Sequence, residues 1–293
     1  MSIVKSLSVG DGDMFYIRHG SDSFTMIDCS MEEWDRKRIV TELKEQSADK
    51  GVVRFISTHP DDDHIMGLRY LHQQMELINF YCVKNQTTKE EPTDDFEQYC
   101  ALRDDPKKAY CLEKGCKRRW LNDTSEERTS AGINVLWPVT SNKWYQEALN
   151  LAAEGESPNN ISAIFKYSQQ DGVTIMWMGD LETDFMESLD QIPVVAADVL
   201  FAPHHGRDSG KVPSGWLDVI SPKLIIIGEA PSEHLNYYAG YNTITQNSAG
   251  DITLDCDGCN VHIYVSEADY GVDFLDEQGM NDAYGSYIGT LKV

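Results

Sequence analysis

Four side chains that can bind metal ions lie within six residues of one another, directly after an apolar run. They are His59, Asp61, Asp63 and His64, in the stretch Ser57-Thr-His-Pro-Asp-Asp-Asp-His-Ile-Met-Gly67. Two imidazoles and two carboxylates this close together are costly to bury or to crowd unless a cation neutralises them. The alternative is an acidic loop that contains two histidines by chance. Four possible ligands directly after a strand favour a metal site instead.

Two later stretches place the same kinds of side chain at the ends of predicted strands. Asp180 follows Met176-Trp-Met-Gly179, and the pair His204 and His205 follows Val199-Leu-Phe201 through Ala202-Pro203. Each stretch alone is weak evidence, because a Gly-Asp pair is often a turn and adjacent histidines are often structural. Three clusters at the carboxyl ends of strands are much harder to attribute to chance. Together they supply enough imidazoles and carboxylates for two metal ions.

The elements that would position these residues alternate along the chain. Runs of β-branched and aromatic residues predict strands over 3–9, 14–18, 24–27, 52–56, 133–137, 161–167, 173–178, 199–201, 223–227 and 261–265. Apolar residues at helical spacing predict helices over 31–46, 183–192 and 213–220, and a helical turn after the first cluster. Strands and helices that alternate in two halves favour an α/β (α+β) fold with two packed sheets and helices outside.

Composition limits the function classes and the setting. The chain has 293 residues with 25 basic and 48 acidic side chains, a net charge of −23. This charge argues against a broad basic face for nucleic acid, although bound cations would reverse the field locally. The odd number of cysteines, seven, and the lack of a signal-like start or a membrane-length apolar run predict a reduced, cytoplasmic setting without a membrane.

We expect a single domain over residues 1–270. Within it, the polar segment 85–131 is expected to be a surface insertion, since its apolar content is low for a core of its own. Residues 271–293 are expected to be an acidic C-terminal tail that packs at an edge or contacts a partner.

These residues resemble the metallo-β-lactamase superfamily, and within it the metal-binding domain of ComEC-like DNA-uptake proteins. The superfamily signature His-x-His-x-Asp-His is matched at His59, Asp63 and His64. Asp61 stands where most members carry the second histidine, and this aspartate variant is similar to ComEC-like members. The resemblance continues, in the family's order, through Val9-Gly-Asp-Gly-Asp13, Ile27-Asp28, Asn159-Asn160-Ile-Ser162, Met178-Gly-Asp180 and Pro203-His-His-Gly206. It therefore spans about residues 3 to 265.

The resemblance implies an αββα metallo-β-lactamase sandwich with its site at the edge between the sheets. Asp180 would bridge two metals, and His204, or less favourably His205, would complete one coordination sphere. Asn159 and Asn160 occupy the third family motif in place of histidine. An amide oxygen from either is a weaker ligand, so that one metal would be held more loosely.

The resemblance also implies two divalent metal ions. Asp61 in place of an imidazole raises the carboxylate share of the ligand set, and hard oxygen ligands suit Mn²⁺ or Mg²⁺ better than histidine-rich sets do. We therefore expect Mn²⁺ to be the more active metal, with Zn²⁺ and Mg²⁺ as the alternatives.

We expect an enzyme that hydrolyses phosphodiester bonds in DNA, an oligonucleotide or a cyclic nucleotide, as ComEC-like and related nuclease members do. Asp63 or Asp61 would orient the attacking water. Arg207, Lys211 and Lys166 are candidates to contact phosphate oxygens, and ordinary surface cations are an equally good interpretation of all three. The acidic composition favours a small substrate, or a partner protein that supplies the grip on nucleic acid.

Two other functions stay open. The same fold supports hydrolysis of other esters, thioesters and lactones, and fold alone does not choose among them. A catalytically silent metal-binding module of a larger complex is the second alternative, and Asn159-Asn160 in the third motif favours it. Asp63, His64, Asp180 and His204 together argue against it, because a scaffold has no evident need for an open two-metal site.

Overall fold

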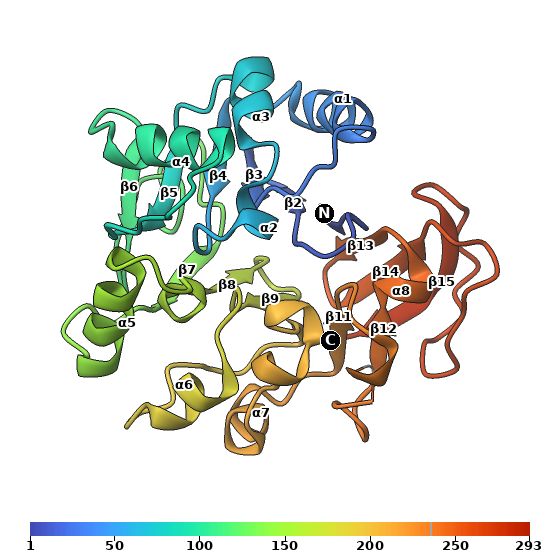
Figure 1. The fold of residues 1–293 in the computed structure, drawn as a ribbon. Coiled ribbons are helices and arrows are strands. Elements are labelled where there is room, and N and C mark those ends of the chain that lie inside the picture. The colour runs from blue at the N-terminus through green and yellow to red at the C-terminus, as the bar shows by residue number, and fades with distance from the viewer. Residues whose placement is uncertain (235) are drawn as a thin grey trace.

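The strands form two sheets that pack face to face (Figure 1). A computed structural model of the chain describes residues 1–234 and 236–293. Within these residues the larger sheet has nine strands, in the order β15 (Ser286–Lys292), β14 (Asn260–Val265), β13 (Ile252–Asp257), β1 (Ser2–Ser6), β2 (Phe15–Arg18), β3 (Ser23–Ile27), β4 (Val52–Ile56), β5 (Phe80–Val83) and β6 (Ala109–Leu112). The strands from β3 to β6 run parallel, and the other neighbours are antiparallel.

The second sheet is also mixed. Its six strands among the described residues follow the order β12 (Thr243–Thr245), β11 (Leu224–Ile227), β10 (Val199–Phe201), β9 (Thr174–Trp177), β8 (Ile164–Ser168) and β7 (Ile133–Trp137). The strands from β9 to β12 are parallel, so their carboxyl ends lie along one edge. The loops that follow these strand ends are the place where α/β proteins commonly carry their functional side chains.

Helices cover the outer faces of both sheets (Figure 1). On the first sheet they are α1 (Arg36–Ser47), α3 (Leu68–Met75) and α4 (Asp94–Asp104), whose apolar residues form one core cluster with the strands beneath. On the second they are α5 (Lys143–Ala153), α6 (Thr183–Ser188) and α7 (Ser214–Ile220), which join the core that fills the space between the sheets. The α/β class predicted from the alternating elements is therefore confirmed.

Several short elements lie in the loops. They are α2 (Asp62–Ile65), α8 (Gln246–Ala249), η1 (Asn159–Ile161), η2 (His204–Gly206), η3 (Asp208–Gly210) and η4 (Ser232–His234). Two of them, α2 and η2, carry histidines from the clusters that the sequence singled out. The carrier elements are thus single turns and not long helices.

Aromatic side chains join the two sheets directly behind these loops. Trp177 stacks on Phe165 and on Phe201, with ring centroids 5.4 Å and 5.0 Å apart. Phe15 of the first sheet meets Phe201 of the second at 4.8 Å. Aromatic pairs of this kind add stabilisation beyond the area they bury. They fix the ends of β9 and β10 against β2, next to the residues that follow each strand.

The polar segment 85–131 and the acidic tail each contribute an edge strand to the larger sheet, and for the tail, packing at an edge is one of its two expected placements. Segment 85–131 supplies α4, which buries Phe96, Tyr99 and Leu102, and edge strand β6. Residues 286–292 form β15, which pairs with β14 at the opposite edge. Short edge strands with mixed polar residues give little periodic signal, so the sequence predicted neither strand.

The length and hydropathy of the helices decide whether any of them could span a membrane. Among the described residues, no helix combines the length and apolar character that are required to cross a bilayer.

We expect Leu43→Ala to lower the free energy of unfolding by about 2–5 kcal/mol, because the cavity left in a packed core is not refilled. Leu43 is completely buried in the cluster beneath α1. Leu151→Ala is the matched control, since Leu151 is 45% exposed and its truncation should change stability by less than about 0.5 kcal/mol. Urea unfolding curves with equal midpoints for both variants would contradict the packing described for α1.

Candidate metal centre

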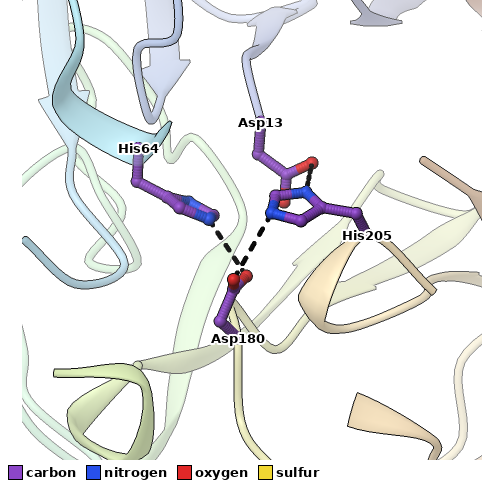
Figure 2. Close-up of side chains that lie close together, drawn as sticks. All are labelled: Asp13, His64, Asp180 and His205. Carbon is purple, nitrogen blue, oxygen red and sulfur yellow. Dashed lines mark ion pairs between the residues drawn. The ribbon is translucent and has the colours of Figure 1, made fainter. Parts of the chain in front are cut away.

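Asp13, His64, Asp180 and His205 come together at the ends of the strands (Figure 2). All four are buried, and each offers one possible ligand atom, these atoms lying within 4.8 Å of one another. Asp13 precedes β2, while the other three follow β4, β9 and β10. The cluster is therefore built from four loops that the two packed sheets bring to one edge.

Asp180 lies between the two histidines. Its Oδ1 is 3.0 Å from His64 Nε2, and its Oδ2 is 3.4 Å from His205 Nε2. Among the described residues, neither Asp180 Oδ1 nor His64 Nε2 has a hydrogen-bond partner, although both atoms are buried. Buried polar atoms in native proteins are almost always satisfied. A carboxylate oxygen and an imidazole nitrogen that converge in this way fit a divalent cation.

A carboxylate lies behind each of these two histidines. Asp28 Oδ2 is 2.9 Å from His64 Nδ1, and Asp13 Oδ1 is 3.1 Å from His205 Nδ1. The hydrogen bond with Asp28 keeps the proton on His64 Nδ1 and leaves Nε2 as a lone pair for a metal, while Asp13 contacts His205 Nδ1 as an ion pair without a hydrogen bond. Both Nε2 atoms are thereby directed at Asp180.

Asp28 is itself held in place by Thr58, the residue before His59. The Thr58 backbone N–H donates to Asp28 Oδ1 at 2.7 Å, and the Thr58 hydroxyl donates to Oδ2 at 2.6 Å. Burial raises the pKa of Asp28, while its contacts with His64 and Thr58 oppose this shift. The Asp28 carboxylate is therefore fixed by Thr58, and in this fixed position it orients the His64 ring.

The charges of the cluster are strongly coupled. Burial alone would lower the pKa of His64, but the carboxylates of Asp180 and Asp28 raise it well above its usual value. The pKa of His205 is likewise raised, against burial, by Asp180 and Asp13. Burial would raise the pKa of Asp180, but both histidines hold it well below its usual range. Without a cation, protons on the imidazoles balance the buried carboxylates.

Asp63 approaches the same point from the open side. Its side chain is 30% exposed, and its Oδ2 is 3.3 Å from His205 Nε2. Burial would raise the pKa of Asp63, yet the contacts with His205 and His64 lower it to about 2. Asp63 is thus ionised at neutral pH and can contact both a cation and an incoming molecule.

His59 lies beside the cluster and is fully buried. Its ring centroid is 4.2 Å from that of His64, and its Nδ1 is 3.1 Å from the Thr58 hydroxyl. Among the described residues, its Nε2 has no hydrogen-bond partner. Burial and the neighbouring His64 lower the pKa of His59 to about 4, so its ring is neutral at physiological pH. His59 can therefore offer a nitrogen lone pair.

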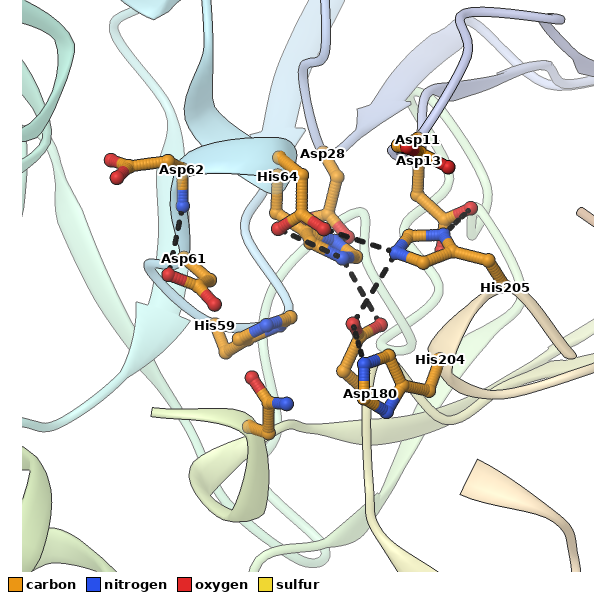
Figure 3. A network of polar contacts seen from close by, with 12 residues as sticks. Asp11, Asp13, Asp28, His59, Asp61, Asp62, His64, Asp180, His204 and His205 are labelled. Carbon is orange, nitrogen blue, oxygen red and sulfur yellow. Dashed lines mark hydrogen bonds and ion pairs between the residues drawn. The ribbon is translucent and has the colours of Figure 1, made fainter. Parts of the chain in front are cut away.

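Asp61, which the sequence predicts to be a metal ligand, makes other contacts (Figure 3). Its Oδ1 accepts from the backbone N–H of Asp62 at 3.0 Å, which caps α2, and from Lys89 Nζ at 3.1 Å. Lys89 also pairs with the Asp62 carboxylate at 2.8 Å. The structure therefore places Asp61 outside the four-residue group, with an ammonium group where the prediction has a metal ion.

The two consecutive histidines have different surroundings. His205 belongs to the four-residue group. His204 Nε2 lies 3.8 Å from Asp180 Oδ2, and its Nδ1 is 2.9 Å from the Ser209 hydroxyl. Burial lowers the pKa of His204. The structure thus reverses the preference that the sequence gave to His204 over His205.

The asparagines of the third motif are also unequal. Asn160 donates to Glu182 Oε2 at 2.7 Å and accepts from the Glu182 backbone N–H at 3.1 Å, so its amide is already engaged. Asn159 is buried, and its Oδ1 has no hydrogen-bond partner among the described residues. Of the two amide oxygens, that of Asn159 is the free one.

Of the three predicted phosphate-binding cations, Arg207 lies nearest in sequence to the centre. It follows Gly206 and pairs with Asp11 at 3.2 Å, and its buried Nε has no hydrogen-bond partner among the described residues. Lys211 Nζ lies 5.5 Å from the centroid of the Tyr237 ring. Lys166 Nζ, on β8, donates to the Ala196 carbonyl at 3.4 Å.

The histidine loop has an unusual backbone. His204, His205 and Gly206 have φ values of 52°, 55° and 86°, in the left-handed region. Residues other than glycine adopt this region at a cost and often do so at functional sites. Gly228 packs against this turn, since a Cβ there would lie 3.1 Å from His205 Cα. The neighbouring strand end therefore allows the turn that points His205 inward.

The sequence did not single out Asp13, Asp28 or Thr58 as site residues. Asp13 and Asp28 lie in stretches that carry the family resemblance, and this resemblance was the sequence evidence that could have identified them as site residues. Their roles depend on which histidine nitrogen each carboxylate approaches, and spacing along the chain does not contain that information.

Comparison with known proteins adds no further evidence. No family model matches the chain, and no curated protein matches its sequence. A function is therefore assigned from the residues and their geometry.

We expect Asp28→Asn to weaken metal binding by about tenfold to a hundredfold, because the amide no longer fixes the His64 tautomer. Isothermal titration of Mn²⁺ or Zn²⁺ into chelator-treated protein measures this change. Asp62→Asn is the control, since that carboxylate is 58% exposed and pairs with Lys89 outside the group. Equal affinities for wild type and Asp28→Asn would contradict the role given to Asp28.

We expect the stability of chelator-treated protein to fall as the pH rises above about 6.5. His64 and His205 have folded-state pKa values above the usual 6.5, so their stabilisation is complete below that pH and is lost as the pH rises through the raised values. A bound cation replaces these protons, so metal affinity should increase over the same range. Thermal unfolding across pH, with and without Mn²⁺, checks both trends. A chelated protein that is equally stable throughout would contradict them.

Proposed function

We propose that the chain is a metal-dependent hydrolase of the metallo-β-lactamase superfamily, of the ComEC-like kind, and that it acts on phosphodiesters. One observation carries the proposal: His64 Nε2 and Asp180 Oδ1 converge to 3.0 Å without a hydrogen bond at the open edge between two sheets. The layer order of helix, sheet, sheet and helix supports the same family.

The residues present fit a divalent cation. Asp180, His64 and His205 would hold it, with Asp63 at the open side and with Asp28 and Asp13 orienting the histidines. Such a cation supplies Lewis acidity and lowers the pKa of a bound water. His59 Nε2 and the Asn159 amide oxygen are the unpartnered atoms that a second cation would use. Asp61 would join them only by leaving Lys89.

The chain's own residues supply the remaining functions. Asp63 stays ionised because the histidines lower its pKa to about 2, so it is suited to orient a water molecule and poorly suited to store a proton. Arg207 has a buried Nε without a partner among the described residues, and a guanidinium group binds phosphate oxygens in fixed geometry. This pairing of a cation site and an arginine favours a phosphodiester over a lactone or thioester.

The net charge of −23 favours a nucleotide or a short oligonucleotide as substrate. Long DNA would require many basic contacts along a groove, or a protein partner that provides them. Arg207, which pairs with Asp11 but keeps a buried Nε without a partner among the described residues, is sufficient for one phosphate group.

We expect wild-type protein to hydrolyse bis-p-nitrophenyl phosphate with added divalent metal, and the double variant Asp63→Ala with His64→Ala to lose at least about a hundredfold in rate. Asp62→Ala is the matched control, because this neighbouring carboxylate lies outside the group. Release of p-nitrophenolate measures the rates. Absence of metal-dependent turnover on phosphate esters, carboxylic esters and thioesters alike would favour a silent metal-binding module.

The silent module is the second candidate function. Asp61 pairs with Lys89, and Asn160 with Glu182, so two of the predicted ligands for a second metal are engaged elsewhere. A module that holds one structural cation would show the metal-dependent stability described above without any turnover.

Metal preference is tested by reconstitution. We expect Mn²⁺ to give the highest activity in chelator-treated protein, because carboxylate and amide oxygens make up a large share of the available ligands. Rates with Mn²⁺, Mg²⁺ and Zn²⁺ at equal occupancy decide the order. Activity with Zn²⁺ alone would exclude this preference.

A further inference from the structure

A cavity of about 430 Å³ lies next to the metal centre. Asp11 and Met66 line it, and each lies two residues from a member of the group, Asp13 and His64 respectively. Two residues of extended chain span about 7 Å at most. The wall of the cavity therefore belongs to the same two loops that carry Asp13 and His64, although none of the four residues of the group lines it.

The cavity offers a surface for a flat, apolar ring. Val9, Ile39 and Met66 contribute aliphatic groups to its wall, and Trp34 lines it from the turn before α1. Trp34 is 82% exposed, the highest exposure of any apolar aromatic side chain among the described residues. An indole left open beside a cavity is a stacking surface for aromatic rings, and nucleobases use such surfaces regardless of sequence.

Carboxylates form the polar part of the lining. They belong to Asp11, Glu32, Asp35 and Glu229, and no lysine or arginine lines the cavity among the described residues. Glu229 Oε1 accepts from the Gly10 backbone N–H at 3.1 Å and from the Ser8 hydroxyl. Its Oε2 has no hydrogen bond among the described residues, so it is free to accept from a ligand. Asp11 pairs with Arg207 and Asp35 with Arg38, so Glu32 and Glu229, which make no ion pair among the described residues, are the carboxylates available to hydrogen-bond donors of a ligand.

We propose that this cavity binds the base of a nucleotide substrate, with Trp34 stacked on the ring and Glu229 accepting from an exocyclic amino group. The inference rests on the proposed phosphodiesterase function, which places the phosphate at the metal centre beside Arg207. Adenine, cytosine and guanine carry an amino donor that a carboxylate can recognise, whereas uracil and thymine do not. Trp34 and Glu229 are thus specificity residues for amino-bearing bases.

The competing occupant is an organic cation. A quaternary ammonium group would also be attracted by an indole face and by carboxylates. It differs from a base in having no hydrogen-bond donor and no ring to stack, so that binding of tetramethylammonium in preference to nucleosides would overturn the proposal.

Equilibrium binding tests the cavity without relying on turnover. We expect guanosine, adenosine and cytidine to bind wild-type protein at least about tenfold more tightly than uridine, and Trp34→Ala to lose about tenfold in affinity for the first three. Trp34→Phe should keep part of this affinity. Val219→Ala is the matched control, because Val219 is also exposed, at 41%, and lies on α7 away from the cavity lining. Titration calorimetry measures each affinity, and equal affinities for wild type and Trp34→Ala would overturn the proposal.

Kinetics then separate this inference from the proposed function. Bis-p-nitrophenyl phosphate has no base, so Trp34→Ala should leave its turnover unchanged while raising KM about tenfold for the dinucleotides GpG and ApA. Glu229→Gln keeps the acceptor for Gly10 but should reduce the preference for GpG over UpU. Turnover of the model ester with unchanged KM for GpG in Trp34→Ala would overturn the inference alone. Nucleoside binding that requires Trp34, without turnover of any ester, would overturn the phosphodiesterase and keep the base site.

Discussion

Negative charge buried between two sheets is the constraint on which the site depends. Asp28 and Asp180 are almost completely removed from water, and an isolated buried carboxylate is strongly disfavoured. Each is placed against an imidazole, so His64 lies between them at 2.9 Å and 3.0 Å. The chain therefore keeps these charges only because protons on the imidazoles, or a cation in their place, can balance them.

The surrounding fold holds this arrangement with rigid parts. The aromatic contacts of Phe15, Trp177 and Phe201 join the sheets where the ligand loops begin. Beyond them the turn at His204–Gly206 adopts a left-handed backbone that the neighbouring Gly228 accommodates. Pre-positioned ligands lose little entropy when a cation binds. The geometry of the site is thus set before any ligand arrives.

The candidate metal site and the α/β class were predictable from the sequence, because strong strand signals end directly at clusters of possible ligands. Strands β4, β7 and β10 have the predicted bounds. The roles of Asp13 and Asp28 were not predictable, since they depend on which face of an imidazole each approaches across a long sequence separation. The partner of Asp61 was missed for the same reason: Lys89 comes from a segment that looked like a surface excursion.

The position of β1 in the larger sheet determines the order in which its two neighbouring strands can pair with it. This first strand lies in the interior of the larger sheet, between β2 and β13, with Ile3 opposite Asp255. A ribosome releases β1 and the loop that carries Asp13 long before residues 252–257 exist. Strands that are this far apart in sequence pair slowly during folding. Strand β1, which leads into the Asp13 loop, therefore gains its second neighbour, β13, only after every histidine of the centre has already been made.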